Sequence, residues 1–175
     1  MKHTHRAKEI VMGIAMKLSD YLKANEVQYE VVHHPHSGNS IQTARASNVP
    51  ACCLAKAVVL EDDTHAVMAV LPASRRLQLR ELQAVSGHAL RLATEADLKD
   101  LFKDCEPGAV PPVGVVYGIE TIWDDSLMEQ PETYIEAGDH ETLVHMKTRD
   151  FIGLMKGARH MALSSQTDEE RRPLF

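Results

Sequence analysis

Two apolar runs joined by a short polar turn constrain the fold of this chain most. Residues 54–60 (LAKAVVL) and 66–71 (AVMAVL) are typical of strands, and residues 61–65 (EDDTH) between them are rich in turn formers. Pro72 ends the second run, because proline has no main-chain N–H to donate to a sheet. The pattern predicts a β-hairpin.

Other segments predict helices and strands in irregular alternation. Helical stripes or helix-capping residues (Ser40, Thr94 and Thr148 at starts, Ser86-Gly87 at an end) mark residues 8–24 with a break near Met16, 40–46, 77–84, 98–102 and 149–156. Strand-like runs cover residues 28–34, 115–119, 133–137 and 141–146, with residues 138–140 as a second hairpin turn. Strands that come in hairpins among scattered helices predict an α+β fold with a mixed or largely antiparallel sheet.

The length of 175 residues fits a single domain. We expect an N-terminal, helical extension over residues 1–16, one domain over residues 17–160, and a polar, flexible tail over residues 161–175.

Composition indicates the compartment. Three cysteines, Cys52, Cys53 and Cys105, are an odd number without framework spacing, which favours a reducing compartment. The chain has no signal-peptide pattern at its start and no apolar run of about 20 residues, so we expect a cytoplasmic protein without a membrane partner.

The net charge of −6 argues against non-specific binding to DNA or other nucleic acids. A local basic face stays open, formed by Arg45, Lys56, Arg75, Arg76, Arg80 and Arg91. Those arginines are equally consistent with a solvated surface.

Lys56 is the one charged residue inside the first apolar run. Strand alternation commonly turns such a lysine to solvent. The alternative is a lysine that faces a cavity, where it needs an anionic partner.

The segment Gly108-Ala-Val-Pro-Pro-Val-Gly114 is a second candidate. Its prolines fix the direction of the main chain and its glycines allow unusual backbone angles, so it either presents amides to a ligand or is a structural turn. The nucleotide-binding, metalloprotease and nucleophile-elbow motifs are absent from the sequence.

Histidine is abundant, with ten residues. His33, His34 and His36 have no established metal-ligand spacing, so we predict no metal site and no cofactor. His140 lies in the second hairpin turn, where it either serves only the turn or binds a ligand hydroxyl and carries a proton. Cys52 and Cys53 have no neighbouring base and are interpreted as small apolar residues.

Over roughly residues 17–156 the chain resembles the YbaK/prolyl-tRNA-synthetase-associated editing domain family. The resemblance rests on an ordered series of segments: KLSDYLKANEVQYEVVHHP, LAKAVVL, AVLPASRRLQLRELQ, TEADLKDLF, GAVPPVG and YIEAGDHETLVHMKTRDF. It implies a barrel-like sheet surrounded by helices. It also implies hydrolysis of the ester between a mischarged small amino acid and the terminal ribose of tRNA, with a synthetase as a further partner.

The resemblance also implies roles for individual residues. Lys56 corresponds to a strand lysine that engages the tRNA 3′ end, and His140 to a polar position in the late hairpin; with Gly108 they form the expected catalytic set. The expected substrate-binding residues are Ser37, Arg75, Ala109, Val110, Pro111, Pro112 and Gly114.

One position departs from the family pattern. Ala57 follows Lys56 where some alanine-specific members have asparagine, which leaves cysteine, serine, threonine or a non-protein amino acid open. Two further functions also stay open. One is a non-catalytic module that binds tRNA or a synthetase, and the other is a metal-dependent hydrolase that uses the histidines.

Overall fold

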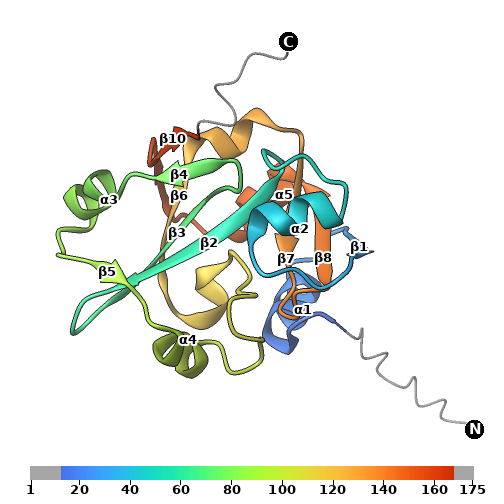
Figure 1. Ribbon diagram of the computed structural model, residues 1–175, viewed down its shortest axis with the longest axis horizontal. Helices are drawn as coiled ribbons and strands as arrows, with labels where there is room; N and C mark the ends of the chain where they lie inside the picture. The colour runs from blue at the N-terminus through green and yellow to red at the C-terminus, as the bar shows by residue number, and fades with distance from the viewer. Residues whose placement is uncertain (1–12, 168–175) are drawn as a thin grey trace, which may run out of the picture.

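The computed structural model describes residues 13–167, in which helices surround one large mixed sheet (Figure 1). The eight strands of this sheet follow the order β1-β8-β7-β2-β3-β6-β9, with β5 paired to β2 beside this path. Their bounds are β1 Glu30–His33, β2 Leu54–Glu61, β3 Ala66–Pro72, β5 Arg91–Leu92, β6 Glu120–Asp124, β7 Glu132–Glu136, β8 Thr142–Lys147 and β9 Arg159–Met161. A second sheet pairs β4 (Arg75–Leu77) with β10 (Ser164–Gln166).

The strand directions confirm the predicted α+β class with a mixed sheet. Strand pairs β2–β3, β7–β8, β1–β8 and β2–β5 are antiparallel, whereas β2–β7, β3–β6 and β6–β9 are parallel. The predicted hairpin is the β2–β3 pair, in register from Ala55–Pro72 to Glu61–Ala66. The sheet is not closed into a barrel, because its pairing order ends at the short strands β1 and β9.

The five predicted helices are present among the described residues. They are α1 Met16–Ala24, α2 Ser40–Ala46, α3 Leu79–Ser86, α4 Glu95–Leu101 and α5 Thr148–Leu154. Helix α1 starts at the predicted break. Of the extension expected to be helical over residues 1–16, residues 13–15 are not helical, and residues 1–12 lie outside the described residues. Thr94 and Asp97 form a reciprocal capping box on α4, and Gly87 ends α3 with φ 73°. None of these helices has the length and apolar character that crossing a bilayer requires.

Three local predictions are wrong. Ser40 does not cap α2, because the N-cap residue is Asn39, whose Oδ1 accepts from Gln42 N at 2.9 Å. Residues 115–119 do not form a strand: Gly114–Tyr117 is the 3₁₀ helix η1, and the strand β6 begins only at Glu120. The chain turns at Gly118, whose φ of 67° no strand accepts, so Ile119 N–H bonds back to Gly114 O at 3.0 Å. Thr148 does not cap α5, because its buried hydroxyl bonds Thr133 Oγ1 at 2.7 Å.

The flexible tail was predicted to begin at residue 161, which is too early. Strand β10 pairs with β4 beyond residue 161, and the side chain of Leu163 is fully buried. The main-chain N–H of Leu163 also donates to Asp124 Oδ2 at 2.6 Å. The ordered fold therefore reaches Gln166, and residues 168–175 lie outside the described part of the chain.

The two faces of the β2 strand belong to different parts of the core. Ala55, Ala57 and Val59 pack into the largest cluster, which includes α1 and α5. On the opposite face, Leu54 belongs to a cluster under α2, and Val58 and Leu60 to another cluster beside α3. This opposite face carries the candidate site.

Candidate active site

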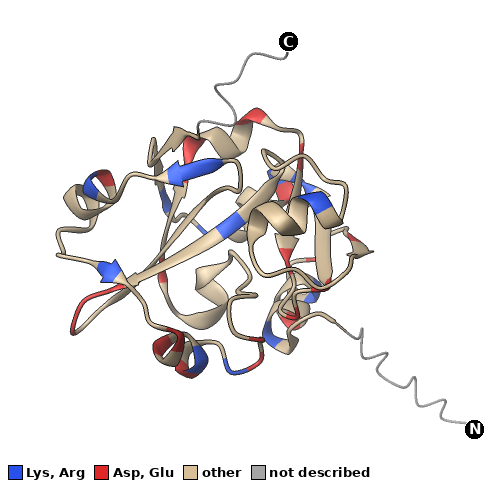
Figure 2. Ribbon diagram, in the orientation of Figure 1, with Lys and Arg blue, Asp and Glu red and all other residues tan. Residues whose placement is uncertain are grey.

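Lys56 lies where the two smaller apolar clusters meet. Strand alternation puts Lys56 on the same face as Leu54 and Val58, which belong to different clusters. It is half-buried and does not extend from the sheet into open solvent. Figure 2 shows basic residues in the middle of β2 and on the neighbouring β4.

The amine of Lys56 lies at the wall of a cavity of ≈ 470 Å³. Nζ donates to Arg75 O at 2.7 Å and to Ala73 O at 3.4 Å. Burial, and then the positive charge of Arg76, lowers the pKa of Lys56. The other lining residues are Ile41, Ala73, Arg75, Arg76, Leu77 and Thr167. An anion bound here would meet two cationic side chains, Lys56 and Arg76.

Arg75 lines the same cavity as Lys56, and its side chain also joins two strands. Its guanidinium donates from Nε to Ser164 Oγ at 2.7 Å and from a terminal nitrogen to Ser164 O at 3.2 Å. It therefore ties β4 to β10, while its carbonyl holds the Lys56 amine. A direct contact between Arg75 and substrate stays a prediction.

Glu136 is a residue that the sequence reasoning missed. It ends β7 one residue beyond Ile135, which is the last residue that pairs with β2, and strand alternation puts it on the same face of the sheet as Lys56. Its side chain is buried; Oε1 accepts from Thr43 Oγ1 at 3.0 Å, and Oε2 has no partner among the described residues. Burial raises the pKa of Glu136, and the bond from Thr43 and the nearby His34 and His140 partly offset this effect.

The predicted residue Ser37 belongs to the same polar network. Ser37 Oγ and Thr43 Oγ1 lie 2.7 Å apart, and Thr43 in turn bonds Glu136. His34, which precedes Ser37 by three residues, is also buried. Its Nδ1 lies 2.9 Å from Pro35 O, and its Nε2 has no partner among the described residues. Buried polar atoms without partners are rare, so the two in this region are candidates for contact with a ligand or water.

His140 joins the hairpin turn to the predicted loop. It has φ 60°, and its carbonyl accepts from Ser37 N at 3.3 Å. Nε2 lies 2.6 Å from Pro107 O, and since a carbonyl can only accept, Nε2 carries the proton. In the neutral ring Nδ1 is then a proton acceptor. The ring also lies 5.1 Å from that of His36.

The loop of residues 108–114 is exposed at its start and buried in the rest. Gly108 has φ 83°, and a Cβ there would lie 3.4 Å from the His140 ring. Ala109, Val110, Pro111, Pro112 and Val113 are buried. Gly114 is required by packing, since a Cβ there would overlap Thr121 Oγ1 and lie 2.9 Å from Ile119 O. Substrate contacts of residues 109–114 stay predictions.

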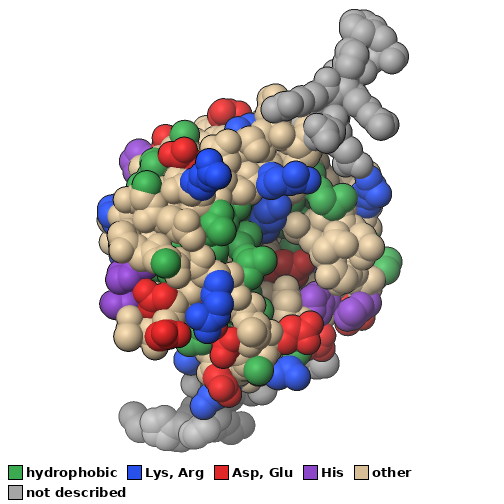
Figure 3. Space-filling model, turned by 60° about the vertical axis from the view of Figure 1, so that its left-hand side comes forward, with side chains coloured by type: hydrophobic (Ala, Val, Ile, Leu, Met, Phe, Trp, Pro, Cys, Tyr) green, Lys and Arg blue, Asp and Glu red, His purple; other side chains and the backbone are tan. Residues whose placement is uncertain are grey.

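The structure therefore brings most of the expected set together around Glu136. Ser37 is linked to Glu136 through Thr43, and the nearby His140 lowers the Glu136 pKa. Lys56 lies on the same face of the sheet, on the adjacent strand β2. Gly108 lies against the His140 ring. Figure 3 shows a hollow in one face of the molecule, with basic and hydrophobic side chains on its walls, acidic side chains deeper in it and histidines at its rim.

Comparison of the sequence with known protein families gives one match. The sequence profile of the aminoacyl-tRNA editing domain matches residues 34–154, which include Lys56, Glu136 and His140. Among curated protein sequences, none matches the chain significantly.

Solved structures share the fold at low sequence identity. A protein described as a candidate trans-editing enzyme for prolyl-tRNA synthetase has a TM-score of 0.74 and 23% identity over 86% of this chain and 96% of its own. A hypothetical protein has a TM-score of 0.75 and 20% identity over 85% and 99%. A protein from Marinobacter aquaeolei VT8, described as a candidate signal transduction protein, has a TM-score of 0.68 and 19% identity over 87% and 31%.

Proposed function

Because the chain belongs to the aminoacyl-tRNA editing domain family, we propose that it is a deacylase that hydrolyses the ester of a mischarged small amino acid on tRNA. The observation that carries this proposal is the buried, partly unpartnered carboxyl of Glu136, which lies on the same face of the sheet as Lys56. An aminoacyl-tRNA end has an ammonium group at one side of the ester and phosphates at the other. A site with an acidic residue next to a cationic cavity is complementary to both.

Each residue has a role in this scheme. Lys56, with Arg76 at the same cavity, binds a phosphate of the tRNA 3′ end. Glu136 Oε2 accepts a hydrogen bond from the α-ammonium group of the amino acid. The main chain at Gly108 and the following loop hold the aminoacyl group, and the buried walls restrict it to small side chains.

The reaction needs no protein nucleophile, because an aminoacyl ester is already activated. A water oxygen bonds to the ester carbonyl carbon, and the carbon–oxygen bond to the ribose then breaks. His140 Nδ1 takes a proton from the water and returns it to the ribose oxygen, which leaves free amino acid and uncharged tRNA. Positioning and electrostatic stabilisation supply the rate.

The proposed partners follow from this substrate. The protein acts on the 3′ end of aminoacyl-tRNA, after release from a synthetase or beside one, in the cytoplasm where tRNA is charged. The alternative is a non-catalytic module of the same fold that binds tRNA or a synthetase. The net charge of −6 and the Lys56 amine already bonded to two carbonyls favour this alternative.

A deacylation screen tests the proposal. The full chain is mixed with tRNAs that carry Ala, Cys, Ser, Thr or a non-protein amino acid, and loss of each ester is timed. Lys56→Met keeps the apolar stem and removes the charge, and we expect it to slow the reaction about 100-fold. Lys23→Met is the matched control, because Lys23 is an exposed lysine on α1.

The two functions give different results in this screen. A deacylase hydrolyses at least one ester rapidly, with Lys23→Met equal to the unchanged protein and Lys56→Met much slower. If no ester is lost above background, the enzyme assignment is wrong. A stable complex with tRNA or a synthetase would then establish the binding module.

A further inference from the structure

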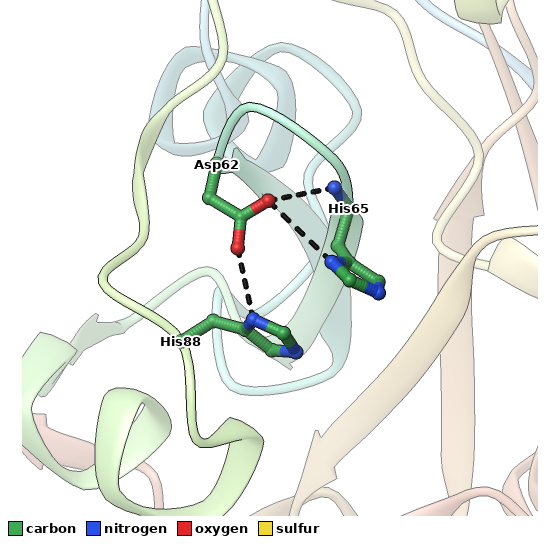
Figure 4. A group of neighbouring side chains, drawn as sticks. All are labelled: Asp62, His65 and His88. Carbon is green, nitrogen blue, oxygen red and sulfur yellow. Dashed lines mark hydrogen bonds and ion pairs between the residues drawn. The ribbon is translucent and has the colours of Figure 1, made fainter.

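Asp62, His65 and His88 form a side-chain cluster at the far end of the β2–β3 hairpin from Lys56 (Figure 4). Asp62 and His65 belong to the hairpin turn, and His88 follows Gly87, which ends α3. Asp62 is six residues beyond Lys56, or about 20 Å at about 3.3 Å per strand residue. The cluster is therefore separate from the candidate active site.

The three side chains are spaced like ligands of one metal ion. Their candidate ligand atoms all lie within 4.8 Å of one another. His88 Nδ1 is 2.9 Å from Asp62 Oδ2, and His65 Nδ1 is 3.5 Å from Asp62 Oδ1. Zinc bonds of about 2.1 Å at tetrahedral angles separate neighbouring ligand atoms by about 3.4 Å. The two distances from the histidines to Asp62 lie close to that separation.

The carboxylate of Asp62 is held in place and charged. Oδ1 accepts from Thr64 N at 2.7 Å and from His65 N at 2.7 Å. The Thr64 hydroxyl also donates to Oδ1, at 3.0 Å. A preformed anion of this kind removes part of the ordering cost of binding a cation.

The two histidines face each other from different segments. Their ring centroids are 4.2 Å apart with an angle of 36° between the planes. His65 Nδ1 lies 2.6 Å from Thr64 Oγ1, a bond that a metal would replace. The side chains of His65 and His88 are 52% and 31% exposed, so an ion can reach both.

The surrounding charge also favours a cation. Glu61 and Asp63 flank Asp62 in the turn, and Arg91 pairs with both of them. Three carboxylates next to one arginine leave a negative excess. Figure 2 shows the acidic residues together at this end of the hairpin.

We propose that Asp62, His65 and His88 bind a divalent transition metal such as Zn²⁺, with water at the remaining position. Two imidazoles and one carboxylate are a donor set that suits zinc better than magnesium or calcium. The bound ion links the β2–β3 turn to the segment between α3 and β5. Its effect is stabilisation of the folded chain, because a metal that binds only the folded state shifts the unfolding equilibrium.

Thermal unfolding and calorimetry of the chelator-treated full chain test the site with ZnCl₂ as the probe. We expect zinc to raise the unfolding midpoint. His88→Ala and, independently, His65→Ala should lower zinc affinity at least tenfold and abolish most of the shift. His33→Ala is the matched control, since His33 is an exposed histidine on β1. Midpoints without metal show whether each variant still folds.

The outcomes separate this site from other histidines. A zinc effect lost in both cluster variants and retained in His33→Ala supports the site. An equal effect in all proteins means an adventitious ion only, for example at His3 and His5 near the N-terminus. No zinc binding by the unchanged protein also overturns the proposal.

Discussion

The hydroxyl of Thr43 donates to Glu136 Oε1 at 3.0 Å and so joins α2 to the end of β7. The bond satisfies one carboxyl oxygen and leaves Oε2, which is equally buried, without a partner among the described residues. One hydrogen bond does not offset the cost of burying a full negative charge. The carboxyl is therefore held in position, and a cationic partner would stabilise it.

The pH dependence of the protein's stability should reveal the ionisation of this buried carboxyl. The folded-state pKa of Glu136 is raised above its ordinary value of 4.5, mainly by burial. The folded state then binds more protons than the unfolded state above pH 4.5, so this group's contribution to stability falls as pH rises through the folded pKa. Urea unfolding of the protein and of Glu136→Gln across this range measures the effect.

We expect the protein to lose stability relative to Glu136→Gln as pH rises. The difference removes the contributions of all other groups, because both proteins share them. A difference in unfolding free energy that stays constant, or that changes in the opposite direction, contradicts a raised pKa.

The proposed contact between Glu136 and the α-ammonium group predicts a change in substrate dependence. Glu136→Gln should lower kcat/KM about tenfold or more on a normal aminoacyl-tRNA, because one charge-assisted hydrogen bond is lost. On an N-acetylaminoacyl-tRNA, which has no ammonium group, the two proteins should have similar rates. If Glu136→Gln slows both substrates equally, Glu136 does not recognise the ammonium group.

The two glycines Gly114 and Gly153 should respond oppositely to alanine. A Cβ on Gly114 meets Thr121 Oγ1 and Ile119 O, so Gly114→Ala should destabilise the protein by about 2 kcal/mol. Gly153 lies in α5 with open space around it, so Gly153→Ala should stabilise by about 0.5 kcal/mol. Chemical denaturation measures both, and equal effects would refute the packing role of Gly114.

Substitution of Leu163 tests whether the fold extends past residue 161. Its side chain is fully buried beside Ile122 and Leu82, so Leu163→Ala should cost about 3 kcal/mol of stability. Leu92→Ala is the control, because Leu92 is 66% exposed and should change stability by about 0.5 kcal/mol or less. Equal thermal midpoints for the two variants would mean that this segment contributes nothing to the fold.

The local sequence pattern was sufficient to predict most of the helices and strands. The hairpin of β2 and β3, the capping box of α4 and the glycine end of α3 all depend on residues close together in the chain, where turn chemistry and capping act. The predicted strand over residues 115–119 was wrong because β-branched composition was outweighed by the turn at Gly118. Strand β6, which begins after this turn at Glu120, was not predicted.

The candidate site was predictable only in part. Lys56 was conspicuous as a charge in an apolar run, and a similar signal existed for Glu136 in the segment YIEA, where it was not used. The contact of His140 with the loop joins residues far apart in the chain. The same holds for His65 and His88.

The sequence by itself determined the α+β class, the central hairpin and the identity of its unusual lysine, because these follow from apolar patterning and turn residues over short distances. The tertiary structure decided which face of β2 bears that lysine, which carboxyl shares this face of the sheet, and that the Arg75 side chain binds β10. Those outcomes depend on strand register and on burial. Both are properties of the whole packed sheet, and no single segment encodes them.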